Sequence, residues 1–414
     1  MRRSGGAAIP MEINFKMLEF HIGNVSVLKN MPDLPADQPF SAQRIDFFNQ
    51  VSRELLSDKE AKAYPDVVTF AFWIRKGNME KYKEEFKKKN GLRMGRGIVF
   101  HIAPSNVAVN YAYSFAVGFV LGNANIVRLP SRDFPQIERI NGAVRKVLER
   151  TKEGKFWKDY IVFLRYGKEK EINDYFSFLC DVRVIWGGDA TIREIRKSEL
   201  RPRVSEITFA DRYSLCLMDV EAYLSETDKE KIASGFYNDT YLTDQNACTS
   251  PRMICWLGNK KEAEKAKEVF WDLLWNLVEK KYDFQPVQSM DKLTEGCMAA
   301  MHMDGIHRIK MRDNRIVRME LEKIDVRVQE YRGHSGFFYE YTTKDITELV
   351  PLCNTKLQTI AFMGRKEQLM PLIKAGVKGI DRIVTIGRTM DFEMVWDGMD
   401  LEERMTRNIT CTVE

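Results

Sequence analysis

The fold is decided by residues 97–130, which read GIVFHIAPSNVAVNYAYSFAVGFVLGNANIVRLP. The first part, 97–103, is a short apolar run that stops at a proline, and this predicts a buried strand. Residues 107–121 are then apolar or small throughout and stop at Gly122, as a buried helix does at its C-terminus. A second apolar run at 126–129 also stops at a proline. The stretch therefore predicts a strand, a buried helix and a second strand.

The same alternation of strand and helix patterns continues through the chain. Repeated strand, helix, strand units are typical of a parallel sheet covered by helices, so the sequence predicts an α/β fold. Residues 41–89 carry apolar and charged residues at helical spacing, which predicts helices with solvated faces. Further strands are expected at 161–164, 182–186, 214–218 and 252–256, and further helices at 135–150, 169–179, 227–237 and 260–279.

Length and composition indicate a large globular protein with two or three folding units. The chain has 414 residues, of which 44% are apolar and 30% are charged. The net charge of +5 is small beside 64 basic and 59 acidic side chains, so no nucleic-acid partner is expected. No apolar run approaches the roughly 20 residues of a membrane span. The N-terminus lacks the apolar core of a secretory signal, and we expect a cytoplasmic protein.

Seven cysteines are scattered without a paired framework, which predicts reduced thiols. Cys248 lies in the stretch DQNACTSPR, residues 244–252, between a helix pattern and an apolar strand. A nucleophilic thiol needs access and a lowered pKa, and the backbone N–H groups of a turn can stabilise both the thiolate and an oxyanion. The alternative is a small buried hydrophobic residue, the commoner role of a lone cysteine. No histidine lies at metal-ligand spacing, so no metal site is expected.

Two turns follow predicted strands and are candidate binding loops, because ligands collect at the carboxyl ends of parallel strands. Asn106 follows the first strand, where its amide could donate to a developing oxyanion or could cap the next helix. Gly187 and Gly188 follow the strand at 182–186. Glycines at such a turn let a pyrophosphate approach the helix N-terminus, although paired glycines also simply make turns.

Glu206 is a carboxylate within an apolar, strand-like stretch. Burial would raise its pKa, and a raised pKa would suit acid/base catalysis. The alternative is a structural salt bridge with Arg203 or Arg212. The sequence does not decide between these two roles.

Read in order, five blocks of the sequence resemble the aldehyde-dehydrogenase superfamily, and specifically its acyl-CoA reductase branch, typified by the fatty-acid reductase subunit of bacterial luminescence. The blocks are specific as a set, and the resemblance spans roughly residues 45–410. They are HIAPSNV at 101–107, FVLGNANIVRLPS at 119–131, IWGGDATI at 185–192, DQNACTSP at 244–251, and residues 392–407 with WDG at 396–398.

The resemblance implies a Rossmann-type cofactor domain, an α/β catalytic domain and a set of site residues. It implies Cys248 as the nucleophile and Asn106 as the oxyanion donor. It places Arg128 and Ser131 near the adenosine ribose, and Gly187-Gly188 beside the pyrophosphate. Most relatives carry Lys at the position of Arg128. A planar guanidinium would favour a 2′-phosphate, so NADP is expected, with NAD as the alternative.

Further expectations follow from the same resemblance. Glu206 falls where hydrolytic members carry their general-base Glu, but the Glu-Leu-Gly-Gly continuation of the family is missing here. Glu340 is a candidate for the second ribose-binding Glu of the superfamily. The expected parts are residues 1–210, mainly the dinucleotide-binding domain with N-terminal helices, 211–375, the catalytic domain with the cysteine, and 376–414, a segment that packs back on the core.

The implied reaction is the reduction of an acyl thioester to an aldehyde through an acyl-enzyme, with the hydride carried by the cofactor. Two alternatives remain open at this point, a hydrolytic aldehyde dehydrogenase and a non-reducing acyl-carrier subunit of a complex. The expected partners are an acyl-CoA or acyl-protein donor, an acyl-activating synthetase, and further copies of the chain in a homo-oligomer.

Overall fold

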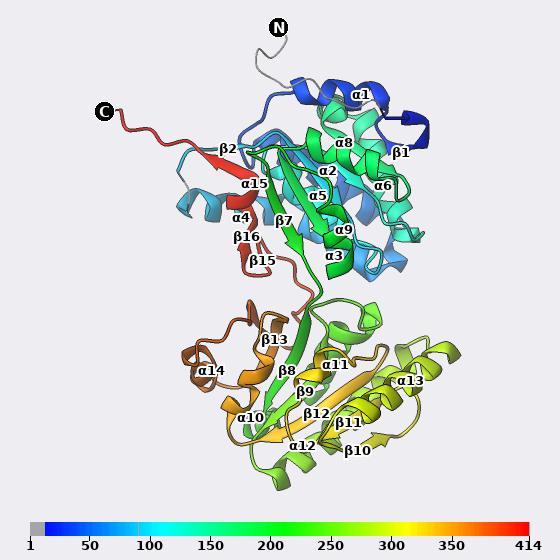
Figure 1. Ribbon diagram of the computed structural model, residues 1–414, viewed down its shortest axis with the longest axis vertical. Helices are drawn as coiled ribbons and strands as arrows, with labels where there is room; N and C mark the ends of the chain where they lie inside the picture. Colours follow the sequence, from blue (N-terminus) through cyan, green and yellow to red (C-terminus); the bar gives the residue numbers. More distant parts are fainter. Residues whose placement is uncertain (1–12, 90, 414) are drawn as a thin grey trace. The chain divides into compact units, whose positions relative to one another are not determined.

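The computed structural model describes residues 13–89 and 91–413, and these form two compact units (Figure 1). Among the described residues, unit 1 comprises those from 13 to 210 together with 399–413, and unit 2 comprises residues 211–398. The sequence predicts residues 376–414 as a single segment. In the structure this segment is divided between the two units. None of the helices in the described residues is long and apolar enough to cross a membrane.

Unit 1 is built on a six-stranded sheet with the order β1-β5-β4-β3-β6-β7. All neighbouring strands are parallel except β1 and β5, which are antiparallel. From β3 the chain proceeds through β4 to β5 on one side and then through β6 to β7 on the other, so the strand order reverses between β3 and β6. The strands are β1 (Glu19–Ile22), β3 (Ile98–Ile102), β4 (Ala124–Arg128), β5 (Ile161–Arg165), β6 (Val182–Trp186) and β7 (Ser205–Phe209).

Helices cover this sheet, and their apolar faces form the core of unit 1 (Figure 1). The central helix, α5 (Asn110–Val120), is buried over nearly its whole length. Two residues after its end, Gly122 has a φ of +91°, which suits glycine. Near the C-terminus, β17 (Thr406–Asn408) pairs antiparallel with β2 (Arg93–Gly95). The other helices of unit 1 are α1 (Val25–Asn30), α2 (Ala42–Ser57), α3 (Pro65–Trp73), α4 (Lys76–Lys89), α6 (Pro135–Arg150), α7 (Lys152–Trp157), α8 (Lys170–Leu179), α9 (Asp189–Ile195) and α15 (Leu401–Met405).

Unit 2 contains a seven-stranded sheet with the order β10-β11-β12-β9-β8-β13-β14. Only β10 and β11 pair antiparallel, and a hydrophobic cluster packs on each face of the sheet. Its strands are β8 (Tyr213–Asp219), β9 (Pro251–Leu257), β10 (Ile306–Met311), β11 (Val317–Leu321), β12 (Phe337–Thr343), β13 (Leu357–Met363) and β14 (Arg382–Thr385), and its helices are α10 (Val220–Ser225), α11 (Lys229–Thr240), α12 (Lys260–Lys281), α13 (Pro286–His302) and α14 (Met370–Lys374).

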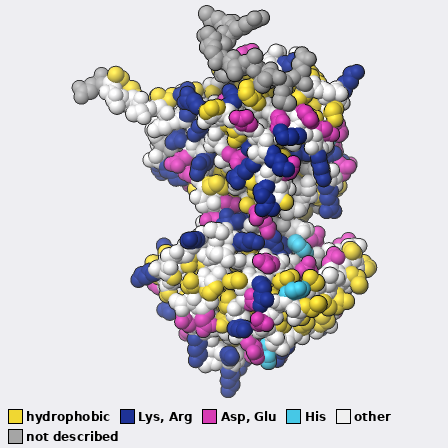
Figure 2. Space-filling view, in the orientation of Figure 1, with side chains coloured by type: hydrophobic (Ala, Val, Ile, Leu, Met, Phe, Trp, Pro, Cys, Tyr) yellow, Lys and Arg dark blue, Asp and Glu magenta, His cyan; other side chains and the backbone are white. Residues whose placement is uncertain are grey.

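Helix α13 is held to unit 2 by a narrow stripe of residues. Its buried residues are Lys292, Gly296 and Ala299. Apolar side chains on its outer face, among them Met290 and Met301, are exposed, and Figure 2 shows hydrophobic side chains gathered over this helix. The helix therefore adds little apolar burial to the core for its length.

Candidate functional site

Cys248 lies on a short loop of unit 2 between α11 and β9. The loop begins with Asp244 and Gln245, whose φ angles of +50° and +56° are left-handed. Such angles are costly for residues other than glycine and persist where surrounding contacts enforce them, as at functional sites. The hydroxyl of Ser214, on β8, donates to the carbonyl oxygen of Cys248 at 2.6 Å, and the cysteine is half-buried. The loop is therefore held in place, and the Cys248 residue is partly exposed.

The side chain of Gln245 provides the main anchor of this loop. Its amide nitrogen donates to the carbonyl oxygens of Pro251 at 3.1 Å and Phe337 at 3.2 Å. Its amide oxygen accepts from the backbone nitrogens of Gly336 at 2.7 Å and Phe337 at 3.1 Å. Gln245 is fully buried, so it fixes the loop to the starts of β9 and β12. Sequence reasoning missed this role, because the partners become neighbours only in the folded sheet.

The environment of Cys248 disfavours its thiolate. Burial, with the carboxylates of Asp397 and Asp211, raises the pKa of the Cys248 thiol to about 11, while Arg252 acts in the opposite direction. The lowered pKa that a nucleophilic thiol needs is thus opposed by the surroundings of Cys248 in this structure. The two carboxylates come from distant parts of unit 2, so no local pattern around the cysteine could reveal them.

The raised pKa predicts a steep pH dependence of thiol alkylation. Since only the thiolate reacts, the iodoacetamide rate at Cys248 should rise about tenfold per pH unit between pH 7 and 10. Peptide mass spectrometry would measure this rate, with the exposed Cys297 on α13 as an internal reference. If the alkylation rate of Cys248 levels off below pH 9, the pKa of its thiol is not raised and the prediction is wrong.

The candidate residues of unit 1 gather at the carboxyl edge of its sheet. Asn106 follows β3 and is exposed, Arg128 ends β4, and Gly187 follows β6. The hydroxyls of Ser105 and Ser131, one after β3 and one after β4, are 3.0 Å apart. This edge includes the point between β3 and β6 where the strand order reverses, the usual ligand-binding position in such sheets.

Asn106 does not cap the following helix. Helix α5 begins at Asn110, its N-cap residue is Val109, and no side chain caps it. The capping role considered for Asn106 from the sequence is therefore wrong, and the residue belongs to the irregular loop between β3 and α5.

Arg128 is oriented by the turn that follows β5. Its guanidinium stacks on the ring of Tyr166, 4.3 Å from the centroid, and donates to the carbonyl oxygen of Gly167 at 2.6 Å. Stacking holds the planar group in one orientation at the sheet edge, which suits recognition of an anion.

Of the two glycines after β6, Gly188 leaves room for a ligand. A Cβ atom at Gly188 would meet nothing within 4 Å, and Gly188 is the N-cap residue of α9. A Cβ at Gly187 would lie 3.1 Å from the side chain of Thr191. A side chain at Gly187 would therefore press on Thr191, whereas the surface at Gly188 is open to an approaching group.

Glu206 is a salt-bridge residue in this structure. It lies on β7, directly across from Arg183 on β6, and accepts from the Arg183 Nε at 2.9 Å. Its other carboxylate oxygen accepts from the Nε of Arg196 at 2.8 Å. The partners differ from the Arg203 and Arg212 expected from the sequence. Both carboxylate oxygens are engaged by guanidinium groups, an arrangement that does not suit a general base.

Glu340 cannot reach a cofactor. It is fully buried on β12, and its Oε1 accepts from the indole nitrogens of Trp256 at 3.0 Å and Trp271 at 2.7 Å. Arg318 lies 3.5 Å from its second oxygen. The sequence-based suggestion that Glu340 binds a ribose is wrong, because its carboxylate belongs to the core of unit 2.

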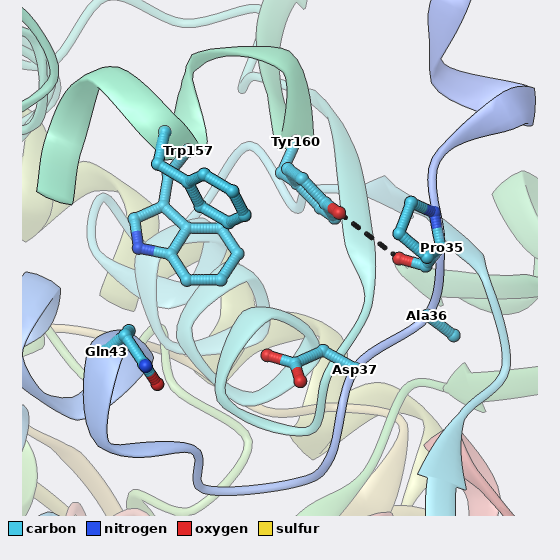
Figure 3. Close-up of a pocket in the computed structure, with 7 residues that line it drawn as sticks. Pro35, Ala36, Asp37, Gln43, Trp157 and Tyr160 are labelled. Atoms are coloured by element: carbon cyan, nitrogen blue, oxygen red, sulfur yellow. Dashed lines mark hydrogen bonds between the residues drawn. The ribbon is translucent and has the colours of Figure 1, made fainter.

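A pocket of about 400 Å³ in unit 1 lies at the other edge of the sheet (Figure 3). Within it, the hydroxyl of Tyr160 donates to the carbonyl oxygen of Pro35 at 3.3 Å. The backbone nitrogen of Asp37 donates to Gly122, which precedes β4, so the pocket is distinct from the carboxyl edge. Its lining contains no candidate nucleophile: Pro35, Ala36, Asp37, Gln43, Phe156, Trp157 and Tyr160.

Several solved structures with this architecture are named as aldehyde dehydrogenases. Aldehyde dehydrogenase 21 from Physcomitrella patens, in complex with the reaction product succinate, matches with a TM-score of 0.66 and 10% identity over 92% of this chain and 87% of that one. The P. syringae indole-3-acetaldehyde dehydrogenase AldA, in complex with NAD+ and IAA, matches with a TM-score of 0.63 and 10% identity over 92% and 85%. PnpE from Pseudomonas sp. WBC-3 matches with a TM-score of 0.64 and 12% identity over 94% and 90%. The chain therefore has the aldehyde-dehydrogenase fold.

Sequence comparison identifies the family more narrowly. The family model described as acyl-CoA reductase (LuxC) matches residues 74–317, which is more than half of the chain. The protein belongs to this acyl-CoA reductase family, and the resemblance seen in the sequence is confirmed. It is an oxidoreductase of the aldehyde-dehydrogenase superfamily that acts on aldehydes or acyl groups. No curated protein sequence matches the chain.

Proposed function

We propose that the protein reduces an acyl thioester, from acyl-CoA or an acyl-protein donor, to an aldehyde through an acyl-enzyme on Cys248, with NADPH as reductant. The observation that carries the proposal is the position of Cys248. It is the half-buried cysteine of a tightly anchored loop with left-handed residues, in a chain of the acyl-CoA reductase family. The other described cysteines are either buried or exposed.

In the proposed reaction, the thiolate of Cys248 attacks the thioester carbonyl, and the Asn106 amide and a backbone N–H stabilise the oxyanion. The bond to the leaving sulfur breaks, and this sulfur takes up the proton that Cys248 gave up. A reduced nicotinamide, when bound, would supply the hydride. The acyl carbonyl held on Cys248 would accept this hydride, and with one proton from solvent would become a thiohemiacetal. The thiohemiacetal collapses to free aldehyde, and Cys248 again carries its thiol.

The carboxyl edge of unit 1 fits such a cofactor. The open surface at Gly188 would accept the pyrophosphate beside the backbone of the α9 turn, and Ser131 would hydrogen-bond the ribose. The stacked guanidinium of Arg128 would pair with the 2′-phosphate that distinguishes NADP from NAD.

Glu206 supports reduction rather than hydrolysis. A hydrolytic dehydrogenase needs a carboxylate free to activate water, and both oxygens of Glu206 are engaged by Arg183 and Arg196. We therefore assign Glu206 no step in the reaction. Oxidation of an aldehyde to a free acid, the alternative reaction, would need a base to activate water, and Glu206 is not free to act as that base.

The test is a panel of acyl-CoA substrates with NADPH or NADH, followed by absorbance at 340 nm and quantification of aldehyde. We expect one aldehyde for each NADPH consumed. Faster oxidation of aldehydes to free acids would favour the hydrolytic alternative. Acyl transfer to Cys248 without consumption of either dinucleotide would favour an acyl-carrier role.

Substitution of Arg128 tests the cofactor assignment. Arg128→Leu should weaken NADPH binding about tenfold or more, because a charge-assisted bond to phosphate is lost, and should affect NADH much less. Fluorescence titration of both dinucleotides would measure this, with the surface variant Arg139→Leu as control. Equal losses for NADH and NADPH would show that Arg128 does not recognise the 2′-phosphate.

A further inference from the structure

Four buried polar side chains of unit 1 form one continuous chain of hydrogen bonds. The indole Nε1 of Trp186 donates to the hydroxyl oxygen of Ser114 at 3.0 Å, and this oxygen lies 2.8 Å from Nδ1 of His101. Nε2 of the same imidazole lies 3.0 Å from Oδ1 of Asn125. The four residues belong to β6, α5, β3 and β4, and each of them is less than a tenth exposed. The chain thus joins the three neighbouring strands whose ends carry the candidate cofactor residues.

The amide of Asn125 decides which nitrogen of His101 carries the proton. Its Nδ2 donates to the carbonyl oxygen of Asn123 at 3.0 Å, and because a carbonyl can only accept, Oδ1 must face the imidazole. Since an amide oxygen also accepts, His101 donates from Nε2. Burial lowers the pKa of His101 to about 4, so the imidazole is neutral at physiological pH and carries a single N–H. Nδ1 is therefore an acceptor.

The hydroxyl of Ser114 is directed from both sides. An indole N–H can only donate, so Ser114 accepts from Trp186, and its own hydrogen goes to Nδ1 of His101. Each polar hydrogen along the chain then has an acceptor. A buried chain that is satisfied in this way holds its side chains in one arrangement, because the loss of any member leaves a buried polar group without a partner.

Gly118, inside α5, leaves the space that this chain occupies. A Cβ atom there would overlap Oδ1 of Asn125 and would lie 2.9 Å from Nε2 of His101. Glycine forms helices less readily than alanine, and only glycine allows the imidazole and the amide to meet against this face of the helix.

Trp186 links the chain to the glycine turn. It is the last residue of β6, and its ring stacks on that of Phe209 at the end of β7, with the centroids 3.7 Å apart. The backbone nitrogen of Gly187, the next residue, donates to the carbonyl oxygen of Phe209 at 3.1 Å. The Ser114 hydroxyl and the Phe209 ring therefore fix the indole, and the backbone of Trp186 leads directly into Gly187 and Gly188.

We infer that Ser114 and His101 are positioning residues for dinucleotide binding: the imidazole directs the Ser114 hydroxyl, which holds the Trp186 indole and thereby the turn at Gly187 and Gly188. The inference rests on the proposed function in one respect, the binding of the pyrophosphate at this turn. Both residues are buried, so they act through Trp186 and not on the cofactor itself.

The first test determines the tautomer of His101 in the full-length protein at pH 7. Two-dimensional 1H–15N NMR of histidine-labelled protein distinguishes the two nitrogens of a neutral imidazole, and the absence of one signal set from His101→Asn assigns them. We expect the proton on Nε2. A proton on Nδ1 would overturn the inference, because Ser114 would then not be directed by the imidazole.

The second test measures the Kd for NADPH by fluorescence titration in a double-mutant cycle. Ser114→Ala should raise the Kd about fivefold or more, because the buried indole N–H loses its acceptor. In a Trp186→Phe background that N–H is absent, so adding Ser114→Ala should change the Kd less than twofold. Acylation of Cys248 by an acyl-CoA without dinucleotide should be the same in Ser114→Ala as in the parent, since Cys248 lies in unit 2.

An unchanged Kd in Ser114→Ala, or an equal increase in both backgrounds, would overturn the inference. If Ser114→Ala does not fold, two substitutions of His101 decide. His101→Asn keeps an acceptor near the place of Nδ1, whereas His101→Gln keeps a donor near the place of Nε2 and loses that acceptor. The Kd should be higher in His101→Gln, and equal values would overturn the inference.

These outcomes separate the inference from the proposed function. A parent protein that binds neither NADPH nor NADH would reject the proposed function, and the positioning role with it. A parent protein that binds a dinucleotide with no dependence on Ser114 would overturn the positioning role alone.

Discussion

Cys248→Ala is expected to abolish turnover, with a loss of more than about 1,000-fold in the rate of aldehyde formation from acyl-CoA and NADPH. Cys248→Ala removes the thiol on which the acyl-enzyme would form. Catalytic residues that act together do not contribute additively, so the remaining groups cannot replace the lost nucleophile. NADPH binding should be preserved, because the proposed cofactor residues lie in unit 1 and Cys248 lies in unit 2. Steady-state assays combined with fluorescence titration of NADPH would separate the two effects.

The matched control is Cys297→Ala on the exposed face of α13, which should keep full activity. The thermal stability of the two variants should differ little, since each loses a single sulfur atom that is not in the core. Substantial activity in Cys248→Ala would rule out the proposed nucleophile.

Gln245→Leu is expected to have the largest effect on stability. The substitution keeps the approximate size of the side chain but leaves two buried N–H groups and two buried carbonyl oxygens without their partner. Each unsatisfied buried group costs ~1–3 kcal/mol, so the loss in free energy of unfolding should reach about 3 kcal/mol or more. Scanning calorimetry would show this as a lower melting temperature for unit 2.

Alkylation of Cys248 in Gln245→Leu should also become faster at neutral pH, because a loosened loop exposes the thiol to water. The exposed glutamine variant Gln43→Leu should change the free energy of unfolding by less than about 0.5 kcal/mol. A Gln245→Leu protein with the parent's melting temperature and alkylation rate would show that Gln245 does not anchor the loop.

The alternating fold was predictable from the sequence because its strands are short, apolar and closed by proline or glycine. The helix expected at 135–150 is α6 (Pro135–Arg150), and the strand expected at 182–186 is β6 (Val182–Trp186). The helix expected at 107–121 begins later, at Asn110. Apolar residues continue through the turn before this helix, so the apolar pattern of the sequence did not indicate where the helix begins.

The electrostatics of the candidate site could not be predicted, because they depend on sheet register and on distant segments. Arg183 faces Glu206 only through the pairing of β6 with β7, and nothing in the sequence around Glu206 indicates that register. Asp397 reaches the environment of Cys248 from nearly 150 positions along the chain. Residue identity therefore indicated the proposed nucleophile, whereas the pKa of its thiol required the folded structure.

The most direct test of the account is the mass of the protein after incubation with an acyl-CoA in the absence of a dinucleotide. We predict that one acyl group is added, that peptide mapping places it on Cys248, and that NADPH removes it with release of one aldehyde. Aldehyde formation that proceeds with no acyl group on Cys248, or with the acyl group on another residue, would contradict the account.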